Sequence, residues 1–280
     1  MKKQMSSKIS KSWSRDDLIL AMNLYCRIPF GRQHSRSPEV IELARALGRT
    51  PGSVAMKLNN FSSLDPEESS RGIQGLKGTS KLDRQIWEEF NADWEKMAIE
   101  SEDLWQKIVV VQNLKYSPQK SIICSNKLPS KRQNEIIPPK SEYIGPTDEE
   151  RLIHARLAQD FFRRTVLSAY GVRCCITGNP VPQLLIACHI LPWSKYPEHR
   201  MNPRNGLCLS RLHDAAFDQG LIAFDEQYRL ALSHDLKEYL PNDSLHRNFE
   251  IYEGRTINLP EKFNPNPEFL KYHRDNIFRV

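Results

Sequence analysis

The stretch from residue 173 to residue 220 decides the fold of the C-terminal half, and it reads RCCITGNPVPQLLIACHILPWSKYPEHRMNPRNGLCLSRLHDAAFDQG. It carries His189 on an apolar run, Asn205 before a glycine, and His213, at separations of sixteen and eight residues. Two strands and a helix over this stretch would bring these side chains together. The set fits phosphodiester hydrolysis, in which a base activates water and a cation balances charge on the phosphate.

Each of the three residues has an expected role in that chemistry. His189, at the end of an apolar strand, would be the general base, because a neutral imidazole accepts a proton near neutral pH. Asn205 would hold the His189 ring, or the loop that carries it. His213 would face the same cleft from a helix as a metal ligand. Taken singly, each residue is also typical of a core, a turn or a helix surface; the ordered set favours catalysis.

At these residues the chain resembles the HNH endonuclease family, which has a ββα-metal fold. The matching segments are QDFFRRTVLSAYGVRCCITG (159–178), ACHILPWS (187–194) and NPRNGLCLSRLHDAAFDQGLI (202–222). The likeness is nearest to the restriction endonuclease branch with an Ala-His-Ile type first motif. The resemblance implies His189 as base, Asn205 as its support and His213 as ligand of a catalytic ion. Asp218 and Arg204 lie in the same motifs.

The resemblance also implies a divalent metal ion as cofactor, with Mg²⁺ first and Mn²⁺, Ni²⁺ or Zn²⁺ as alternatives. Cys188 stands where many HNH enzymes carry a histidine or aspartate ligand. A thiolate is a soft ligand that suits zinc better than magnesium. Cys188 is therefore either buried strand packing or a metal ligand beside His213. Cys174 and Cys175 are adjacent and no Cys-x-x-Cys occurs, so we expect no structural zinc.

Residues 13–108 have the pattern of helices. Capping signals at Ser14 with Asp17, at Ser37-Pro38 and at Thr50-Pro51 predict three starts, and a long amphipathic helix is expected over 80–108. The second and third helices resemble a helix-turn-helix, although a tight helical hairpin has the same pattern. If it reads DNA, the contacts would come from Arg45, Arg49, Ser53, Lys57 and Asn59.

The C-terminal half is expected to begin with a helix from Thr147 to Tyr170, ended by Gly171. Arg163 and Arg164 on this helix, with Arg204, are further candidates for DNA binding. Hairpins are predicted from 172–177 with 184–191 and from 221–224 with 228–232, and a helix within 205–217.

Composition and charge divide the chain into three parts. Proline, serine and lysine predict a linker over 111–146, with a short strand at 121–124, and residues 115–140 hold six basic side chains against one acidic. Such a tract either follows a phosphate backbone or is simply solvated. We expect an α+β protein: an all-α, helix-turn-helix-like domain at 1–110, the linker, and a ββα-metal nuclease domain at 147–280.

The bulk composition limits the class of partner. Forty Lys and Arg against 34 Asp and Glu give a net charge of +6, which favours an anionic partner. Because no run of about 18 apolar residues exists and the start has no apolar core, we expect no membrane contact, a bacterial cytoplasmic location and reduced cysteines.

The leading hypothesis is a DNA endonuclease of restriction or antiviral defence. One alternative is a catalytically decayed DNA-binding protein. Another is a nuclease subunit recruited by protein partners of a defence system through its N-terminal domain. A double-strand break would favour a homodimer.

Overall fold

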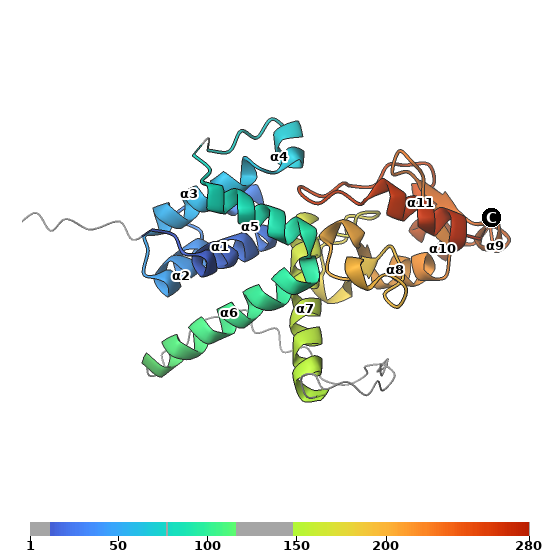
Figure 1. Cartoon of the computed structure of the whole chain (residues 1–280). Helices are drawn as coiled ribbons and strands as arrows, with labels where there is room; N and C mark the ends of the chain where they lie inside the picture. Colours follow the sequence, from blue (N-terminus) through green and yellow to red (C-terminus); the bar gives the residue numbers. More distant parts are fainter. Residues whose placement is uncertain (1–11, 77, 116–147, 280) are drawn as a thin grey trace, which may run out of the picture.

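The chain divides into a helical N-terminal part and a mixed C-terminal part, which meet along one helix, α7 (Asp148–Ala169) (Figure 1). This computed structural model describes residues 12–76, 78–115 and 148–279, without the side chains of 109–115 and 148–154. The expected strand at 121–124 and the Thr147 cap lie outside the described residues. Among the described residues, no helix is both long and apolar enough to cross a membrane.

The helical part begins as its capping signals predict. Its helices are α1 (Arg15–Arg27), α2 (Pro38–Leu47), α3 (Pro51–Ser62), α4 (Pro66–Ser70), α5 (Lys81–Ala92) and α6 (Trp94–Lys115), with a 3-10 turn at Phe30–Arg32. Ser14 and Asp17 form the expected capping box at α1, and the Thr50 side chain caps α3. Gly48 ends α2 with φ +63°, a left-handed conformation that glycine adopts without a Cβ penalty.

The single helix expected over 80–108 is wrong, because the chain breaks at Asp93. Asp93 is non-helical (φ −149°) and separates α5 from α6. Its carboxylate accepts a hydrogen bond from the amide of Lys96 at 3.0 Å, so it caps the second helix. The apolar period runs on through the break, with Phe90 and Trp94 both buried and in edge-on ring contact, which is why the pattern alone did not reveal it.

The C-terminal part is built on a ββα unit. Strand β1 (Leu185–His189) pairs antiparallel with β2 (Gly206–Ser210), and α8 (Arg211–Asp218) follows directly. Leu185 lies opposite Ser210 and His189 opposite Gly206. A Cβ at Gly206 would collide with the side chain of Val166 on α7, so glycine permits the hairpin to lie this close to the helix.

The hairpin expected between 172–177 and 184–191 is therefore wrong in its partner. Residues 174–179 form a turn, in which the Cys174 amide donates to the Asn179 carbonyl at 3.0 Å. Cys175 contacts the sheet through a hydrogen bond from its backbone amide to the Cys208 carbonyl, at 2.8 Å. The true partner lies at the far end of the excursion 190–205, and its run GLCLS is buried throughout.

The remaining elements pack around this unit. The closing hairpin forms as predicted, and short helices follow: β3 (Ile222–Phe224), β4 (Leu230–Leu232), α9 (His234–Lys237), α10 (Asp243–Asn248) and α11 (Pro267–Asn276), with 3-10 turns at Pro182–Leu184, Pro197–His199, Pro203–Asn205 and Glu250–Tyr252. His273 of α11 stacks on the Phe217 ring of α8, with centroids 3.6 Å apart, and donates from Nε2 to the Phe217 carbonyl.

Helix α7 joins the two parts into one buried core. Phe161 is fully buried against Phe90 and Trp94 of the helical part, with ring centroids 6.5 and 6.4 Å apart. The next residue, Phe162, packs on the β1 strand through the His189 ring. Lys262, from the C-terminal part, is also fully buried in the helical part and donates from Nζ to the carbonyls of Tyr25 and Ile28 at the end of α1.

Replacement of Phe161 by alanine tests whether α7 holds the two parts together. We expect Phe161→Ala to lower the free energy of unfolding by about 3–5 kcal/mol, because the cavity opens in the shared core. Chemical denaturation measures it. Leu259→Ala, at a side chain 44% exposed, is the control and should stay within about 0.5 kcal/mol. A loss below about 1 kcal/mol for Phe161→Ala would contradict this account.

His273 makes stability depend on acid pH. Burial lowers the pKa of His273 from 6.5 to about 4. As the pH falls through 6.5, the unfolded chain takes up the proton first, so this contribution to stability is complete above pH 6.5 and is lost down to about pH 4. Replacing His273 by glutamine, which keeps an N–H donor, should reduce the pH slope of the unfolding free energy in that window, by at most about 1.4 kcal/mol per pH unit. Identical slopes in wild type and variant would disprove it.

Candidate active site

His189 lies at the end of β1 with its ring held on three sides. The ring stacks on Phe162 with centroids 4.1 Å apart and planes 7° apart, and it meets the Trp193 ring edge-on at 5.2 Å. Nε2 lies 2.8 Å from the carbonyl oxygen of Arg200. Because a carbonyl only accepts, Nε2 carries the hydrogen, and Nδ1 keeps its lone pair. Nδ1 makes no hydrogen bond to the described residues.

The environment of His189 favours the neutral ring. Burial lowers the pKa of His189 below 6.5, more than the hydrogen bond to the Arg200 carbonyl raises it. At neutral pH the imidazole is therefore uncharged. Its tautomer and its charge are both those of a proton acceptor at Nδ1.

Asn205 holds the loop between the strands and does not contact the His189 ring. It is buried, its Oδ1 accepts from the Leu191 amide at 2.8 Å, and its Nδ2 donates to the His199 carbonyl at 3.1 Å. Its own carbonyl accepts from the Ile190 amide. The side chain thus joins the two ends of the loop that contains Arg200. Of the two arrangements expected for Asn205, the structure has the one in which it supports the loop.

Two carboxylates of α8 gather at the thiol of Cys188, the residue before His189 in the sequence. Cys188, Asp214 and Asp218 place one ligand atom each within 4.8 Å of one another. The aspartates are one turn apart on α8, so both carboxylates lie on the same face. The Cys188 thiol lies 3.8 Å from Oδ1 of Asp218.

Burial and charge repulsion raise the pKa values of the groups in this cluster. Burial, and then the charge of Asp214, raise the pKa of Asp218 to about 6. Burial also raises the pKa of Asp214, and together with Asp214 it raises the pKa of the Cys188 thiol far above its usual value. The thiol is thus protonated at neutral pH and donates to the carboxylates. A divalent cation would relieve the repulsion between the half-buried carboxylate of Asp214 and the more exposed one of Asp218, so the donor set fits a metal.

Comparison with known proteins agrees with this geometry. Residues 174–225, which contain β1, β2, α8 and β3, match the model of a family described as HNH endonuclease. This segment is an HNH endonuclease domain. A search of curated proteins found no match. The α+β fold, with a helical N-terminal region and this HNH domain in the C-terminal part, is the one expected from the sequence.

His213 lies on α8 of the HNH domain, outside the Cys188 cluster. Its side chain is buried, and Nε2 donates to the Asn248 carbonyl at 2.7 Å. Nδ1 consequently accepts from the Ser210 hydroxyl, at 2.6 Å. Both ring nitrogens are therefore hydrogen-bonded, and His213 does not belong to the group of candidate ligand atoms that Cys188, Asp214 and Asp218 form. The i, i+4 spacing of Asp214 and Asp218 is the feature of the sequence that could have predicted two carboxylates on one face of a helix.

The arginines expected to bind DNA near the HNH domain are partly engaged. Arg204 makes an ion pair with Glu67 of α4 in the helical part. Arg164 is exposed and pairs with Asp160 at 3.6 Å, one turn away. Arg163 donates to the Pro182 carbonyl at 3.4 Å. Arg204 thus joins the loop beside Asn205 to the helical part.

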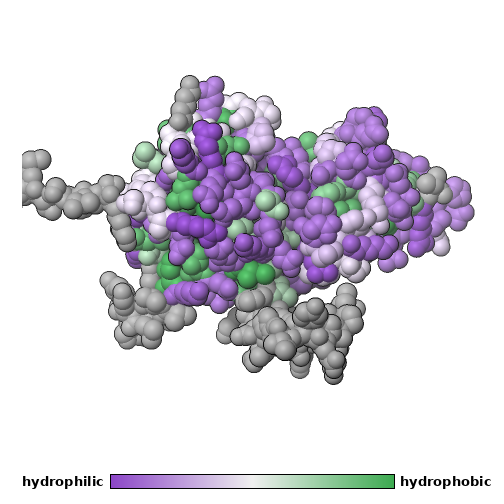
Figure 2. All heavy atoms as spheres, viewed as in Figure 1, coloured by the Kyte–Doolittle hydropathy of each residue, from purple (hydrophilic) through white to green (hydrophobic). Residues whose placement is uncertain are grey.

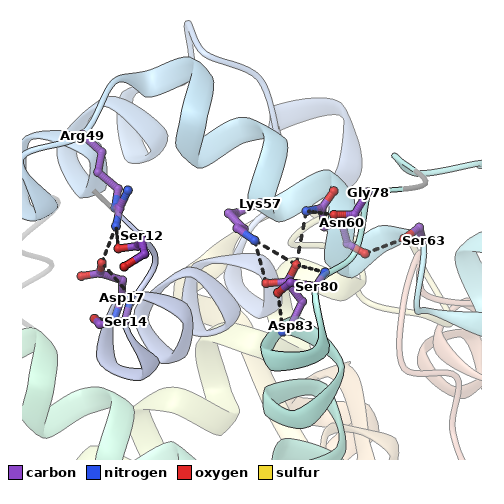
Figure 3. Close-up of polar contacts among 10 residues, drawn as sticks. All are labelled: Ser12, Ser14, Asp17, Arg49, Lys57, Asn60, Ser63, Gly78, Ser80 and Asp83. Carbon is purple, nitrogen blue, oxygen red and sulfur yellow. Dashed lines mark hydrogen bonds and ion pairs between the residues drawn. The ribbon is translucent and has the colours of Figure 1, made fainter. Parts of the chain in front are cut away.

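Two cations of the α2–α3 hairpin bind capping carboxylates within the helical part (Figure 3). Arg49 contacts Asp17 at 2.7 Å and lies over the Trp13 ring, and Lys57 contacts Asp83, the N3 residue of the α5 capping box, at 2.8 Å. Asn59 donates to the carbonyls of Gln33 and Ala55. These contacts stabilise the helix packing.

The other two residues of the hairpin that were expected to contact DNA are exposed to different degrees. Arg45 is exposed, and Ser53 is half-buried with its amide on the Thr50 cap. Of the basic candidates on the hairpin, Arg45 is the one whose side chain is exposed at the surface.

The role of Asn205 can be tested apart from catalysis. In Asn205→Ala, the buried Leu191 amide and His199 carbonyl lose their partner, which costs about 1–3 kcal/mol per buried group. We expect a loss of that size in the free energy of unfolding, and faster amide hydrogen exchange at Leu191. Asn276→Ala, at an exposed amide near the end of α11, is the control. Unchanged exchange at Leu191 would contradict the assignment.

Proposed function

We propose that this protein is a metal-dependent DNA endonuclease in which His189 is the general base. The observation that supports it best is the hydrogen bond from Nε2 of His189 to the Arg200 carbonyl, which leaves Nδ1 as the acceptor. A neutral imidazole held in this tautomer can take the proton of the water that attacks a phosphodiester. Asn205 is a positioning residue, because it acts through the loop that carries Arg200.

The same proposal gives Asp214 and Asp218 the role of metal ligands. A divalent ion held there would act as a Lewis acid that neutralises charge on the scissile phosphate. Two carboxylates suit the hard ions Mg²⁺ and Mn²⁺, whereas zinc prefers nitrogen and sulfur. The Cys188 thiol, protonated and hydrogen-bonded, orients the carboxylates.

Removal of the base should strongly reduce cleavage. With Mg²⁺ and a supercoiled plasmid, we expect His189→Ala to lower the cleavage rate about 10²–10⁴-fold, the usual contribution of a general base. His234→Ala removes an exposed imidazole and should cut as the wild type does. Wild-type cleavage by His189→Ala would refute the assignment.

The metal ligands can be separated from the thiol by substitution. Asp218→Asn should lose cleavage at least about 10²-fold and bind Mn²⁺ more weakly by calorimetry, because a neutral amide replaces one of two carboxylates. Cys188→Ser should retain Mg²⁺-dependent cleavage within about tenfold. Asp235→Asn, at an exposed carboxylate, is the control. Loss of cleavage in Cys188→Ser, together with Zn²⁺-supported cleavage by the wild type that the variant lacks, would make the sulfur a ligand.

The biological role proposed with this activity is restriction or defence against foreign DNA in the bacterial cytoplasm, as the resemblance to restriction endonucleases implies. A double-strand break by one HNH site would need two copies of the chain, which favours a homodimer at the target.

A second role, recruitment by a protein partner, is favoured by the exposed face of α3. A groove of about 620 Å³ beside α3 has a mixed lining, with the apolar side chains of Phe30, Met56 and Leu76 beside polar ones such as Gln33 and Asn59. Met56 is 60% exposed and Leu76 44%. Figure 2 shows apolar residues exposed over the helical part, whereas the C-terminal part is mostly hydrophilic on that face. Such apolar surface is typical of protein contacts. Salt-sensitive DNA binding that is lost in Arg45→Gln would favour DNA reading instead.

A further inference from the structure

A second polar pocket lies at the start of α8, outside the Cys188 cluster. It has a volume of about 500 Å³ and is lined by Asn179, Arg211, His213, Arg247 and Tyr252, among others. Arg211 begins α8 and Arg247 lies near the end of α10, so the two guanidinium groups come from separate elements. Both side chains are exposed, and neither makes an ion pair with the described residues. We call this site the arginine pocket.

His213 builds the arginine pocket. Its ring spans from the Ser210 hydroxyl at the start of α8 to the Asn248 carbonyl at the end of α10. The neighbours of these two partners in the chain are Arg211 and Arg247. The buried ring also contacts Phe249, with centroids 5.0 Å apart. The two cations are thus brought to one pocket by a buried, fully hydrogen-bonded side chain.

The start of α8 adds further positive character. The Ser210 hydroxyl is engaged by His213 and caps no amide of the first turn. The positive end of the helix dipole and these amides therefore face the pocket region without a capping oxygen. Two guanidinium groups beside uncapped amides are suited to an anion with several oxygens, such as a phosphate.

The hairpin sets the distance from the pocket to the base. Ser210, at the pocket, pairs with Leu185, and Gly206 pairs with His189 four residues along the strand. At about 3.3 Å per residue the two ends are about 13 Å apart. Phosphates of one DNA strand advance about 3.4 Å per nucleotide along the helix axis and also turn around it, so this separation is at most about four nucleotide steps.

We propose that the arginine pocket binds a backbone phosphate of duplex DNA, a few nucleotides from the scissile one. The proposal rests on the proposed function, since it names a second contact of the same substrate. Arg211 and Arg247 are its ligands, and they bind the sugar-phosphate backbone without reading sequence.

The test measures DNA binding by the full chain without metal, so that no cleavage occurs. Fluorescence anisotropy with a 20-base-pair duplex gives Kd between 50 and 300 mM salt in EDTA. Arg211→Gln/Arg247→Gln should weaken binding by about tenfold at low salt, equally on unrelated sequences, and reduce the slope of log Kd against log salt by about 1. Arg229→Gln/Lys271→Gln removes two exposed charges from the same part of the chain and should retain the wild-type slope.

The outcomes separate this proposal from the nuclease proposal. A wild-type slope in the double arginine variant, or an equal change in the control, would overturn the arginine pocket even if the wild type cuts DNA. A wild type that binds duplex DNA but cuts none with any metal would refute the nuclease, while a reduced slope would still support the pocket. No duplex binding by the wild type at 50 mM salt would overturn both.

Discussion

The packing of two adjacent phenylalanines on α7 is the constraint on which the rest of the molecule depends. Phe161 is buried among Phe90 and Trp94 of the helical part, and Phe162 stacks on the ring of His189. Neighbouring residues on a helix point about 100° apart, so one turn of α7 packs against both parts of the molecule. The orientation of the candidate base is thereby tied to the packing of the helical part, although more than seventy residues separate Trp94 from the HNH segment.

Local chemistry predicted most helix boundaries, because caps act within a few residues. Ser14, Thr50 and Gly48 do in the structure what their side chains or backbone allow. The pairing of β1 with β2 could not be predicted in this way. The sixteen residues from His189 to Asn205 contain no regular period, and a shorter, incorrect hairpin with 172–177 satisfied the same apolar pattern. Pairing across a long loop depends on tertiary contacts such as those of Asn205.

In the candidate site too, the sequence predicted the positions of residues within a motif but not their contacts with distant segments. His189 and Asn205 lie where their motifs place them, at the strand end and in the loop. The position of His213 on α8 was predictable, but its hydrogen bond to the Asn248 carbonyl was not, because α10 has no motif connecting it to the site. For the same reason, the capping carboxylates Asp17 and Asp83 were not expected to bind Arg49 and Lys57.

The burial of Lys262 limits how this architecture can be rearranged in evolution. Its ammonium group from the C-terminal part is fully buried in the helical part, where it donates to the carbonyls of Tyr25 and Ile28 and lies over the Tyr25 ring. A fusion that exchanged the helical part for another recognition domain would leave this cation without its carbonyls, and would expose Phe161 as well. Recombination between the parts would therefore preserve these contacts only when α7 and the segment around Lys262 are inherited together with the helices they contact. Despite the linker-like composition between them, the two parts are not exchangeable modules, because each fills buried positions in the other.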